Sequence, residues 1–283
     1  LVFNSNGSFS FFPFNEYQYI SLDDSVEVSF TYTASDTLGV LSSEATITLK
    51  ITGLNDAPVS NDYSYETFEN SILNDQITSI NDVDSDGYDL NSFQLVDNVE
   101  IGTLELNSDG TFVYDSENNF EELSVNETDE ASFSYYIADV HGVLSDTSII
   151  TIIINGENDA PESYNLNLEM DEDSIISSSV PTATDIDNDG INTNGYQLIE
   201  DVNLGSLIFN SDGSFVFDTH DDFQNLSIGE TGEVFFTYIV RDINGLQSNI
   251  SQITITITGV NDAPVSNDYS YETFENSILN DQI

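Results

Sequence analysis

The stretch GTLELNSDGTFVYD, from Gly102 to Asp115, alternates apolar and polar residues on both sides of the turn sequence NSDG. Asp-Gly tolerates the positive φ angles of a tight hairpin turn, so this stretch predicts two antiparallel strands. Related turns lie inside LVFNSNGSF from Leu1 and LIFNSDGSF from Leu207, before and after it in the chain. The hairpin is therefore one element of a repeated structure.

A fixed spacing defines the repeat. The tag NDAP begins at Asn55, Asn158 and Asn261, and 158 − 55 = 261 − 158 = 103 residues. The 23 residues NDAPVSNDYSYETFENSILNDQI occur unchanged at 55–77 and 261–283, two periods apart, whereas the copy between them has diverged. Self-similarity at a fixed period indicates a tandem array, and this pattern favours an alternating pair of domains that was duplicated.

We expect two complete domains flanked by two partial ones, as in a segment of a longer array. The predicted bounds are 1–56 for the C-terminal part of a repeat, 57–159 and 160–262 for complete repeats, and 263–283 for the N-terminal part of a further repeat. About 100 residues is the usual size of one compact domain.

The apolar pattern predicts an all-β fold. VEVSFTYTA, from Val26 to Ala34, alternates with period two, as half-buried strands do, and no segment shows a sustained helical period. Each repeat is predicted to be an antiparallel β-sandwich of the immunoglobulin or cadherin-like type with about seven strands. In 57–159 the strands are expected near 63–67, 71–74, 92–96, in the hairpin, and at 131–138 and 145–154, with the first and last strands running in the same direction.

The charge balance limits the partners. The chain has 52 Asp and Glu but only 2 Lys and Arg, a formal net charge of −50, and no cysteine. Contacts to nucleic acid or anionic membrane need basic side chains, so neither partner is expected, and no apolar run is long enough for membrane insertion. With 39% hydrophobic residues the chain is expected to fold, its charge offset by bound cations. A solvated acidic surface adapted to high salt is the alternative.

Two motifs of the form D-x-D-x-D-G suggest that the cation is Ca²⁺. They are DVDSDG at 82–87 and DIDNDG at 185–190, again 103 residues apart. Alternate carboxylates followed by a glycine turn allow a loop to wrap the ion with oxygen ligands. The twelfth position is Phe93 or Tyr196 instead of Glu, so this is not a helix-loop-helix site. The alternative is an Asp-rich turn solvated by water.

Further acidic residues are expected to meet these motifs. The predicted strand order brings the loop before the last strand, the D-x-D-x-D-G loop and the incoming NDAP linker to one pole of each domain. Glu69 and Glu172 are expected at the other pole, near the following linker. Oxygen ligands without Cys or His favour Ca²⁺ over zinc or copper. The candidate metal ligands are Asn55, Asp56, Glu69, Asp82, Asp84, Asp86, Asp139, Asn158, Asp159, Glu172, Asp185, Asp187, Asp189, Asp242, Asn261 and Asp262, and Asp36 has the phase of Asp139.

Together, GTLELNSDGTFVYD, FSYYIAD, SIITIIINGENDAP and DVDSDG resemble the cadherin-like tandem repeats, including the VCBS type, of very large bacterial surface adhesins. NDAP also resembles the calcium-binding linker of true cadherins. The resemblance implies one junction site from Asn158, Asp159, Asp185, Asp187, Asp242 and Glu69, and an earlier one from Asn55, Asp56, Asp82, Asp84 and Asp139. The family's EDG after the first strand reads FENS or DEDS here, so the implied role of Glu69 and Glu172 departs from the pattern.

The resemblance implies an exported, non-enzymatic extender on the bacterial cell surface, in which calcium stiffens contacts between neighbouring repeats. The alternative is that the repeats themselves bind surface glycans or sister filaments through many weak sites. Tyr63 and Tyr65 are candidates for such binding, whereas Tyr32, Tyr135 and Tyr238, at one phase, are expected in the core. An enzyme is disfavoured because His141 and His220 differ in phase and no serine, cysteine or lysine nucleophile is expected beside them.

Overall fold

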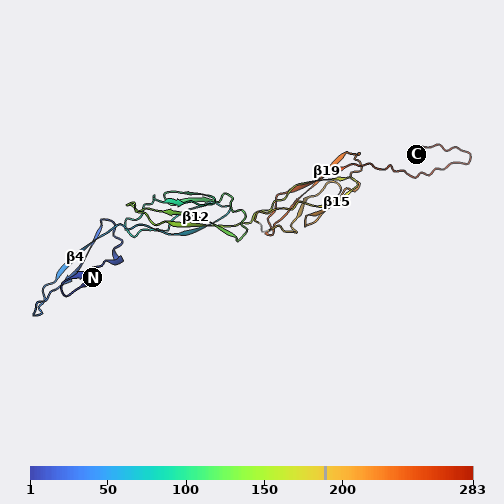
Figure 1. Ribbon diagram of the computed structural model, residues 1–283. Coiled ribbons are helices and arrows are strands. Elements are labelled where there is room, and N and C mark those ends of the chain that lie inside the picture. Colours follow the sequence, from blue (N-terminus) through green and yellow to red (C-terminus); the bar gives the residue numbers. More distant parts are fainter. Residues whose placement is uncertain (188–189, 283) are drawn as a thin grey trace. The chain divides into compact units, whose positions relative to one another are not determined.

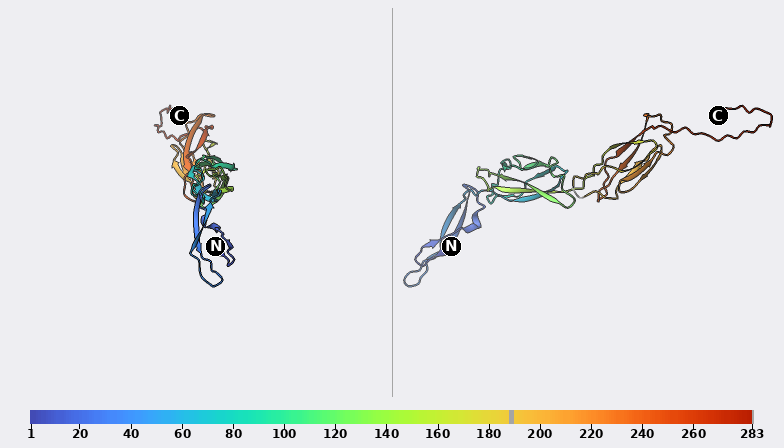
Figure 2. Two further views of the ribbon diagram at one scale, coloured as in Figure 1. Left: turned by 90° about the vertical axis from the view of Figure 1, so that its left-hand side faces the viewer. Right: turned by 45° about the vertical axis from the view of Figure 1, so that its right-hand side comes forward.

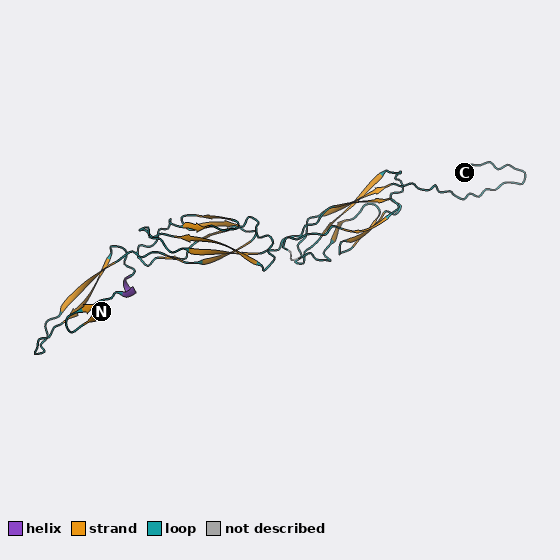
Figure 3. Cartoon of the chain, in the orientation of Figure 1, coloured by secondary structure: helices purple, strands orange, loops and turns teal. Residues whose placement is uncertain are grey.

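The computed structural model describes residues 1–187 and 190–282 and divides into two compact units, Leu1–Asn158 and Asp159–Ile283. Each unit is described by itself. Strands dominate both, and the one helix of the described residues is the short 3-10 helix η1, Phe14–Tyr17 (Figures 1 and 3). The predicted all-β class is confirmed.

The first unit contains two strand pairs and then the first repeat, which we define as strands β5 to β13. The pairs are β1 (Val2–Phe3) with β2 (Phe9–Ser10), and β3 (Ser25–Tyr32) with β4 (Ala45–Thr52). The first repeat comprises β5 (Val59–Ser60), β6 (Tyr63–Phe68), β7 (Leu73–Gln76), β8 (Ile80–Asn81), β9 (Gln94–Asp97), β10 (Thr103–Leu106), β11 (Thr111–Asp115), β12 (Thr128–Tyr136) and β13 (Ser148–Asn155).

The second unit contains the second repeat, strands β14 to β20. They are β14 (Leu166–Asp171), β15 (Ile175–Ser179), β16 (Gln197–Glu200), β17 (Ser206–Phe209), β18 (Ser214–Asp218), β19 (Thr231–Ile239) and β20 (Ser251–Thr258). Adding 103 to the bounds of β10 to β13 gives the bounds of β17 to β20, so the sequence repeat is also a structural repeat. The described residues of 263–282 contain no strand.

Each repeat is a sandwich of two sheets, which the further views show as two layers (Figure 2). In the first repeat the sheets have the orders β6-β13-β12-β9 and β10-β11-β7, and the second repeats this arrangement with β14-β20-β19-β16 and β15-β18-β17. One ladder per repeat departs from the predicted antiparallel pattern, because the first strand pairs with the last in parallel, as in β6 with β13. Their common direction agrees with the predicted strand order.

The hairpin predicted for 102–115 forms, with Thr103 opposite Asp115 and Leu106 opposite Phe112. Gly110 has φ +82° in its turn, where a Cβ atom would lie 2.8 Å from the Phe93 ring. The strand expected at 71–74 is β7, which begins at Leu73, two residues later than expected, and the short β5–β8 ladder was not predicted.

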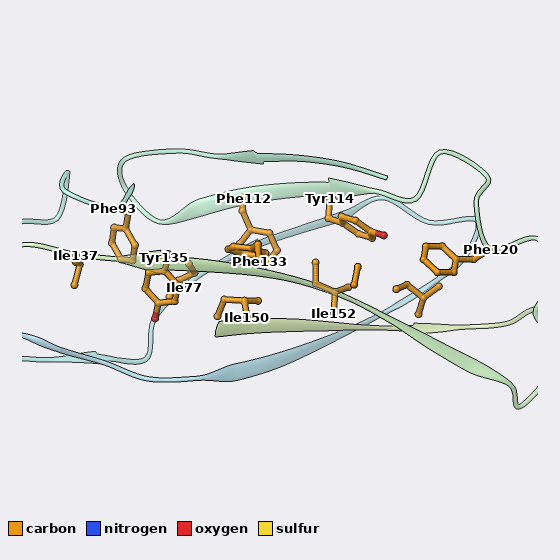
Figure 4. Close-up of a cluster of buried hydrophobic side chains, with 12 residues drawn as sticks. Ile77, Phe93, Phe112, Tyr114, Phe120, Phe133, Tyr135, Ile137, Ile150 and Ile152 are labelled. Carbon is orange, nitrogen blue, oxygen red and sulfur yellow. The ribbon is translucent and has the colours of Figure 1, made fainter. Parts of the chain in front are cut away.

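The alternating side chains of both sheets form the core of each repeat, and Figure 4 shows the core of the first repeat. In the first repeat Ile150, Ile152 and Ile154 are fully buried beneath the aromatic rings of the facing sheet. Tyr135 and Tyr238 are also fully buried, and their hydroxyls donate to the carbonyls of Asn61 (3.2 Å) and Tyr164 (2.8 Å). The expectation of a core tyrosine is confirmed for Tyr135 and Tyr238 but is wrong for Tyr32, which is 38% exposed.

A glycine just before each NDAP linker allows two backbone segments to touch. A Cβ atom at Gly156 would lie 2.3 Å from the carbonyl oxygen of Leu123, and the equivalents Gly53 and Gly259 would meet carbonyl oxygens at 2.1 Å and 2.4 Å. Backbone atoms cannot turn away as a side chain can, so the last strand keeps its position beside this loop only with glycine there.

We expect Gly156→Ala to lower the free energy of unfolding of the first repeat by about 2–4 kcal/mol, because the chain must shift to remove this overlap. Gly142→Ala is the control, since its Cβ would meet nothing within 4 Å but its φ of +85° alone costs about 1–2 kcal/mol. Urea denaturation of both variants checks the order, and equal losses would contradict it.

Candidate metal centre

Three segments of the first unit converge at one end of the first repeat. The linker residues Asn55 and Asp56 lead into β5, which pairs with β8, and β8 leads directly into the loop DVDSDG. A bridge between Tyr88 and Asp139 joins the end of that loop to the turn before β13. The structure therefore brings the linker, the acidic loop and the last loop together as the strand order predicted.

Hydrogen bonds tie the linker to the aspartates. The backbone amide of Asp56 donates to Asp84 Oδ2 at 2.8 Å, and Asn55 Nδ2 donates to Asp139 Oδ2 at 2.6 Å. Asp84 N in turn donates to Asp82 Oδ1 at 3.0 Å, which fixes the turn of the acidic loop. We use the name linker aspartate group for four aspartates and one asparagine, which are Asn55, Asp56, Asp82, Asp84 and Asp139.

The linker aspartate group contains buried charge. Asp84 and Asp139 are only 5% and 4% exposed, although a buried carboxylate is costly unless it is paired or bound to a metal. Oδ1 of Asp139 accepts from the amides of His141 and Val143, at 2.9 and 2.8 Å. By contrast, Asn55 Oδ1, Asp82 Oδ2 and Asp84 Oδ1 are enclosed and have no hydrogen-bond partner in the structure. Three enclosed oxygens of this kind fit an oxygen-ligated cation.

The pKa values respond to this crowding in different directions. Burial, together with the neighbouring charges of Asp84 and Asp139, raises the pKa of Asp82 above its ordinary value. Burial also opposes ionisation of Asp139, but hydrogen bonds from Asn55 and the nearby amides outweigh it and lower its pKa. The pKa of Asp86 is lowered by the ring of His141, whose Nε2 lies 2.7 Å from Asp86 Oδ2.

The second unit reproduces the central contacts. The Asp159 amide donates to Asp187 Oδ2 at 2.8 Å, the same bond that Asp56 makes with Asp84, since both residue numbers increase by 103. Asp187 and Asp242 are each 1% exposed, and Asp242 Oδ1 accepts from Leu246 N at 2.9 Å. Asp189, another predicted ligand, lies outside the described residues.

Glu69 and Glu172 lie at the other end of their repeats, as expected. Glu69 follows β6, and its Oε1 accepts from the amide of Glu157, immediately before the next NDAP linker, at 2.7 Å. Glu172 accepts in the same way from Val260 N at 2.7 Å, and their exposed fractions are 1% and 0%. The Oε2 atom of Glu172 is buried without a hydrogen-bond partner.

The remaining predicted ligands are more open. Asp36 and Asp86 are exposed, and so are Asn261 and Asp262, where Asn261 Nδ2 donates to the Asp262 carbonyl at 3.3 Å. Asn158 and Asp185 are partly buried. In the part of the chain that the structure describes, no three His, Asp or Glu side chains are already gathered around one point as metal ligands. Ion binding would thus require the carboxylates to turn towards each other.

Sequence reasoning missed two contacts of the linker region. Gln18 Nε2 donates to Asp56 Oδ2 at 3.1 Å, and Ser85 Oγ donates to the Tyr19 carbonyl at 2.7 Å. The first joins a residue before NDAP to the linker itself, and the second joins another such residue to the acidic loop DVDSDG. The sequence did carry a signal of the first contact. The position of Gln18 is polar in all three copies, with Glu121 and Gln224 at the equivalent positions.

Two other sequence expectations meet different outcomes. Tyr65 packs on Phe112, and its hydroxyl donates to the Gln76 carbonyl at 2.9 Å, so it is a structural residue, whereas Tyr63 is 54% exposed. The expectation that no serine lies beside a histidine is wrong, because Ser206 Oγ lies 2.9 Å from His220 Nε2. Both side chains are solvent exposed, so water competes for this bond.

The described residues contain no helix that is both long and apolar enough to cross a bilayer.

The chain belongs to the bacterial cadherin-like domain family, which matches residues 55–156 and 158–259. Its domains are therefore adhesion-type extracellular repeats, a class that is typically non-enzymatic. Solved structures similar to the chain are cadherin ectodomains. Mouse clustered PcdhgC3 EC1-3 has 13% identity and a TM-score of 0.49, with 87% of this chain and 80% of that chain covered.

Two further structures show the same similarity. The protocadherin GammaB4 extracellular domain has 16% identity and a TM-score of 0.49, with 90% of this chain and 40% of that chain covered. Mouse Cadherin-23 EC22-24 has 16% identity and a TM-score of 0.45, with 86% and 77% covered. A search of curated proteins found no significant match.

We expect Asp82→Asn to raise the melting temperature at pH 7 in a metal chelator. The folded-state pKa of Asp82 lies above its unfolded value, so ionisation of Asp82 removes stability as the pH rises through the folded pKa, and Asn does not ionise. The difference between variant and wild type should shrink as the pH falls and vanish near about pH 3, where the carboxyl is neutral in both states.

The control is Asp109→Asn, in the hairpin turn. Thr111 donates to Asp109 through its hydroxyl and its amide, which lowers the pKa of Asp109, so this stability is present above the unfolded pKa and is lost as the pH falls through the folded pKa. Asp109→Asn should therefore lower the melting temperature at pH 7. A rise in both variants would mean that only the overall charge matters.

Proposed function

We propose that the chain is a stalk segment of a large bacterial surface adhesin, in which Ca²⁺ bound at each NDAP linker stiffens the connection between neighbouring repeats. The observation that supports this most directly is the hydrogen bond from the linker amide to a buried aspartate, made identically by Asp56 with Asp84 and by Asp159 with Asp187. A site that recurs with the period of the domains fits a role in connecting them.

The chemistry of the linker aspartate group favours calcium. Its ligands would be carboxylate and amide oxygens alone, the set that Ca²⁺ accepts in six- to eight-fold, irregular coordination. Mg²⁺ requires a more regular octahedron, and zinc prefers nitrogen or sulfur. The nearby imidazole of His141 is already bonded to Asp86. Bound calcium would supply positive charge where the carboxylates are held closest together.

The residues proposed as ligands are those predicted from the sequence. For the first linker they are Asn55, Asp56, Asp82, Asp84, Asp86 and Asp139. The equivalent set is Asn158, Asp159, Asp185, Asp187, Asp189 and Asp242, while Asn261 and Asp262 begin a third. Glu69 and Glu172 remain proposed ligands, because each carboxylate is buried against the residue before a linker.

The proposed stiffening of the linker is an effect of the charge on its carboxylates. Without a cation, the ionised carboxylates of Asp82, Asp84 and Asp139 repel one another, and the linker is held only by single hydrogen bonds. A bound cation would attract the same carboxylates and the oxygen atoms of Asn55 and Asp56 to one positive charge, and this would draw the linker onto the repeat. If each repeat adds roughly 40 Å, from strands of about ten residues at 3.3 Å each and a linker, an array of them can hold an adhesive module far from the cell.

We expect calcium to raise the melting temperature of the full chain and to increase its radius of gyration in small-angle scattering. At a free concentration one hundred times the dissociation constant, one site adds about 2.7 kcal/mol to the stability. The double variant D84N/D139N should lose most of the calcium response of the first repeat.

The matched control is the double variant D62N/D146N, which removes two charges from the same repeat. The second repeat has asparagine at both positions, since 62 + 103 = 165 and 146 + 103 = 249. Asn165 also keeps the bond that Asp62 makes, accepting from Gln252 N where Asp62 accepts from Ile149 N, both at 2.7 Å. Calcium responses that are equal in the two double variants, or absent from the wild type, would refute the calcium sites and favour a solvated acidic surface.

A further inference from the structure

The outward face of β14, β20 and β19 in the second repeat carries an uncharged groove. Its lining residues are Asn165, Asn167, Gln252 and Thr254, and its volume is about 230 Å³. The strand register places Asn167 beside Thr254 on one side and Phe235 beside Thr254 on the other. We call these five residues the amide face, with the 43% exposed ring of Phe235 at its border.

The amide face has unused hydrogen-bonding capacity. Asn165 Oδ1 accepts from Gln252 N at 2.7 Å, and Gln252 Nε2 donates to Thr254 Oγ1 at 2.9 Å. These two bonds hold the side chains in place and leave the Asn165 amide donors, the Gln252 carbonyl oxygen and the Thr254 hydroxyl proton available. A ligand with both donors and acceptors can therefore be bound without rearrangement of the sheet.

The strand beside the groove carries a buried hydroxyl. Thr237 lies opposite Gln252 in the ladder, is 9% exposed, and its Oγ1 has no hydrogen-bond partner in the structure. The equivalent residue of the first repeat, Ser134, is satisfied, since its Oγ donates to Asp97 Oδ2 at 2.7 Å and accepts from Asp97 N at 3.0 Å. The second repeat has Glu200 at the position of Asp97, since 97 + 103 = 200, and Glu200 lies opposite Thr237 in the ladder, so the two repeats differ in this contact as well.

The first repeat does not carry this face. At the positions of Asn165, Asn167, Phe235, Gln252 and Thr254 it has Asp62, Ser64, Ser132, Ile149 and Thr151, each 103 residues earlier. Four of these five positions differ, although the core and the linker contacts are shared between the repeats. The amide face is therefore a property of the second repeat and not of the fold.

Charge identifies the chemistry of the ligand. In a chain of net charge −50, the four groove side chains are neutral, while Glu169 and Glu233 flank Thr256 in the next row of the same face. Anionic ligands would be repelled by these carboxylates, whereas hydroxyl groups can donate to them. Amide and hydroxyl side chains next to an exposed aromatic ring suit a neutral, polyhydroxylated molecule with an apolar C–H face.

We propose that the amide face of the second repeat binds a neutral carbohydrate, with Asn165, Asn167, Gln252 and Thr254 hydrogen-bonding its hydroxyls and Phe235 packing against a sugar ring. None of the four groove residues belongs to the proposed calcium sites, so this binding does not depend on them. In an array of alternating repeats, such a site would occur once in every two domains and would act by avidity.

The test is affinity electrophoresis of the full chain, in calcium, through native gels that contain dextran, laminarin, yeast mannan or agarose galactan. Alginate, a polymer of uronic acids, is the anionic probe. We expect at least one neutral polysaccharide to retard the chain and alginate to have no effect. No retardation by any of the four neutral polymers, or equal retardation by alginate, would overturn the proposal.

Residues exchanged between the repeats supply the variants. N167S/Q252I and Phe235→Ser insert what the first repeat already has at these positions, so folding should be retained, which circular dichroism checks. We expect each to weaken retardation at least about tenfold, the loss of roughly 1.4 kcal/mol of hydrogen bonding or packing. Retardation unchanged in both variants would place binding elsewhere and reject the amide face.

The reciprocal exchange is S64N/S132F/I149Q in the first repeat. If the amide face suffices for binding, this variant should gain a second site, and calorimetric titration with an oligosaccharide of the retarding polymer should show the stoichiometry rise from one to two. An unchanged stoichiometry in a folded variant would contradict that sufficiency.

Discussion

The parallel pairing of the first and last strands of each repeat is the constraint on which the other features depend. Because β6 and β13 run in the same direction, the chain enters a repeat at one end of the sheet and leaves it at the other. Parallel neighbours need a long connection, and here the connection is the rest of the sandwich. The entrance linker therefore meets Asp84 and Asp139, while Glu69 is placed against the exit.

The positions of the buried acidic side chains follow from this parallel strand arrangement. The core of each repeat is made of isoleucine and aromatic side chains, so burial of charge is confined to the two ends, where Asp84, Asp139 and Glu69 contact backbone amides or the linker. Hydrogen bonds from amides compensate part of the desolvation of a carboxylate. They also hold the aspartates close to one another, and this is why the proposed cation sites lie at the ends of a repeat and not in its core.

The two repeats separate what the fold requires from what it allows to vary. Gly156 and Gly259 are the same because a backbone contact demands it, and Tyr135 and Tyr238 are the same because each hydroxyl donates to the carbonyl of a residue just before β6 or β14. The outward face of the sheet has no such requirement, so Ile149 and Ser132 can be replaced by Gln252 and Phe235. Substitutions on that face change the groups available for binding and leave the packing of the core unchanged.

The sequence by itself determined the repeat, the all-β class and the hairpins, because these depend on period-two patterns and on turn residues that act locally, as in NSDG. The sequence placed the start of β7 two residues early and did not predict the β5–β8 ladder, because short strands without alternation carry no local signal. It also named the acidic residues near each linker. Only the tertiary structure decided which of them are buried and what they contact, as with Asn55 and Asp139, 84 residues apart. The physical reason is that burial and pairing at that separation exist only after the parallel closure of the sandwich has brought the segments together.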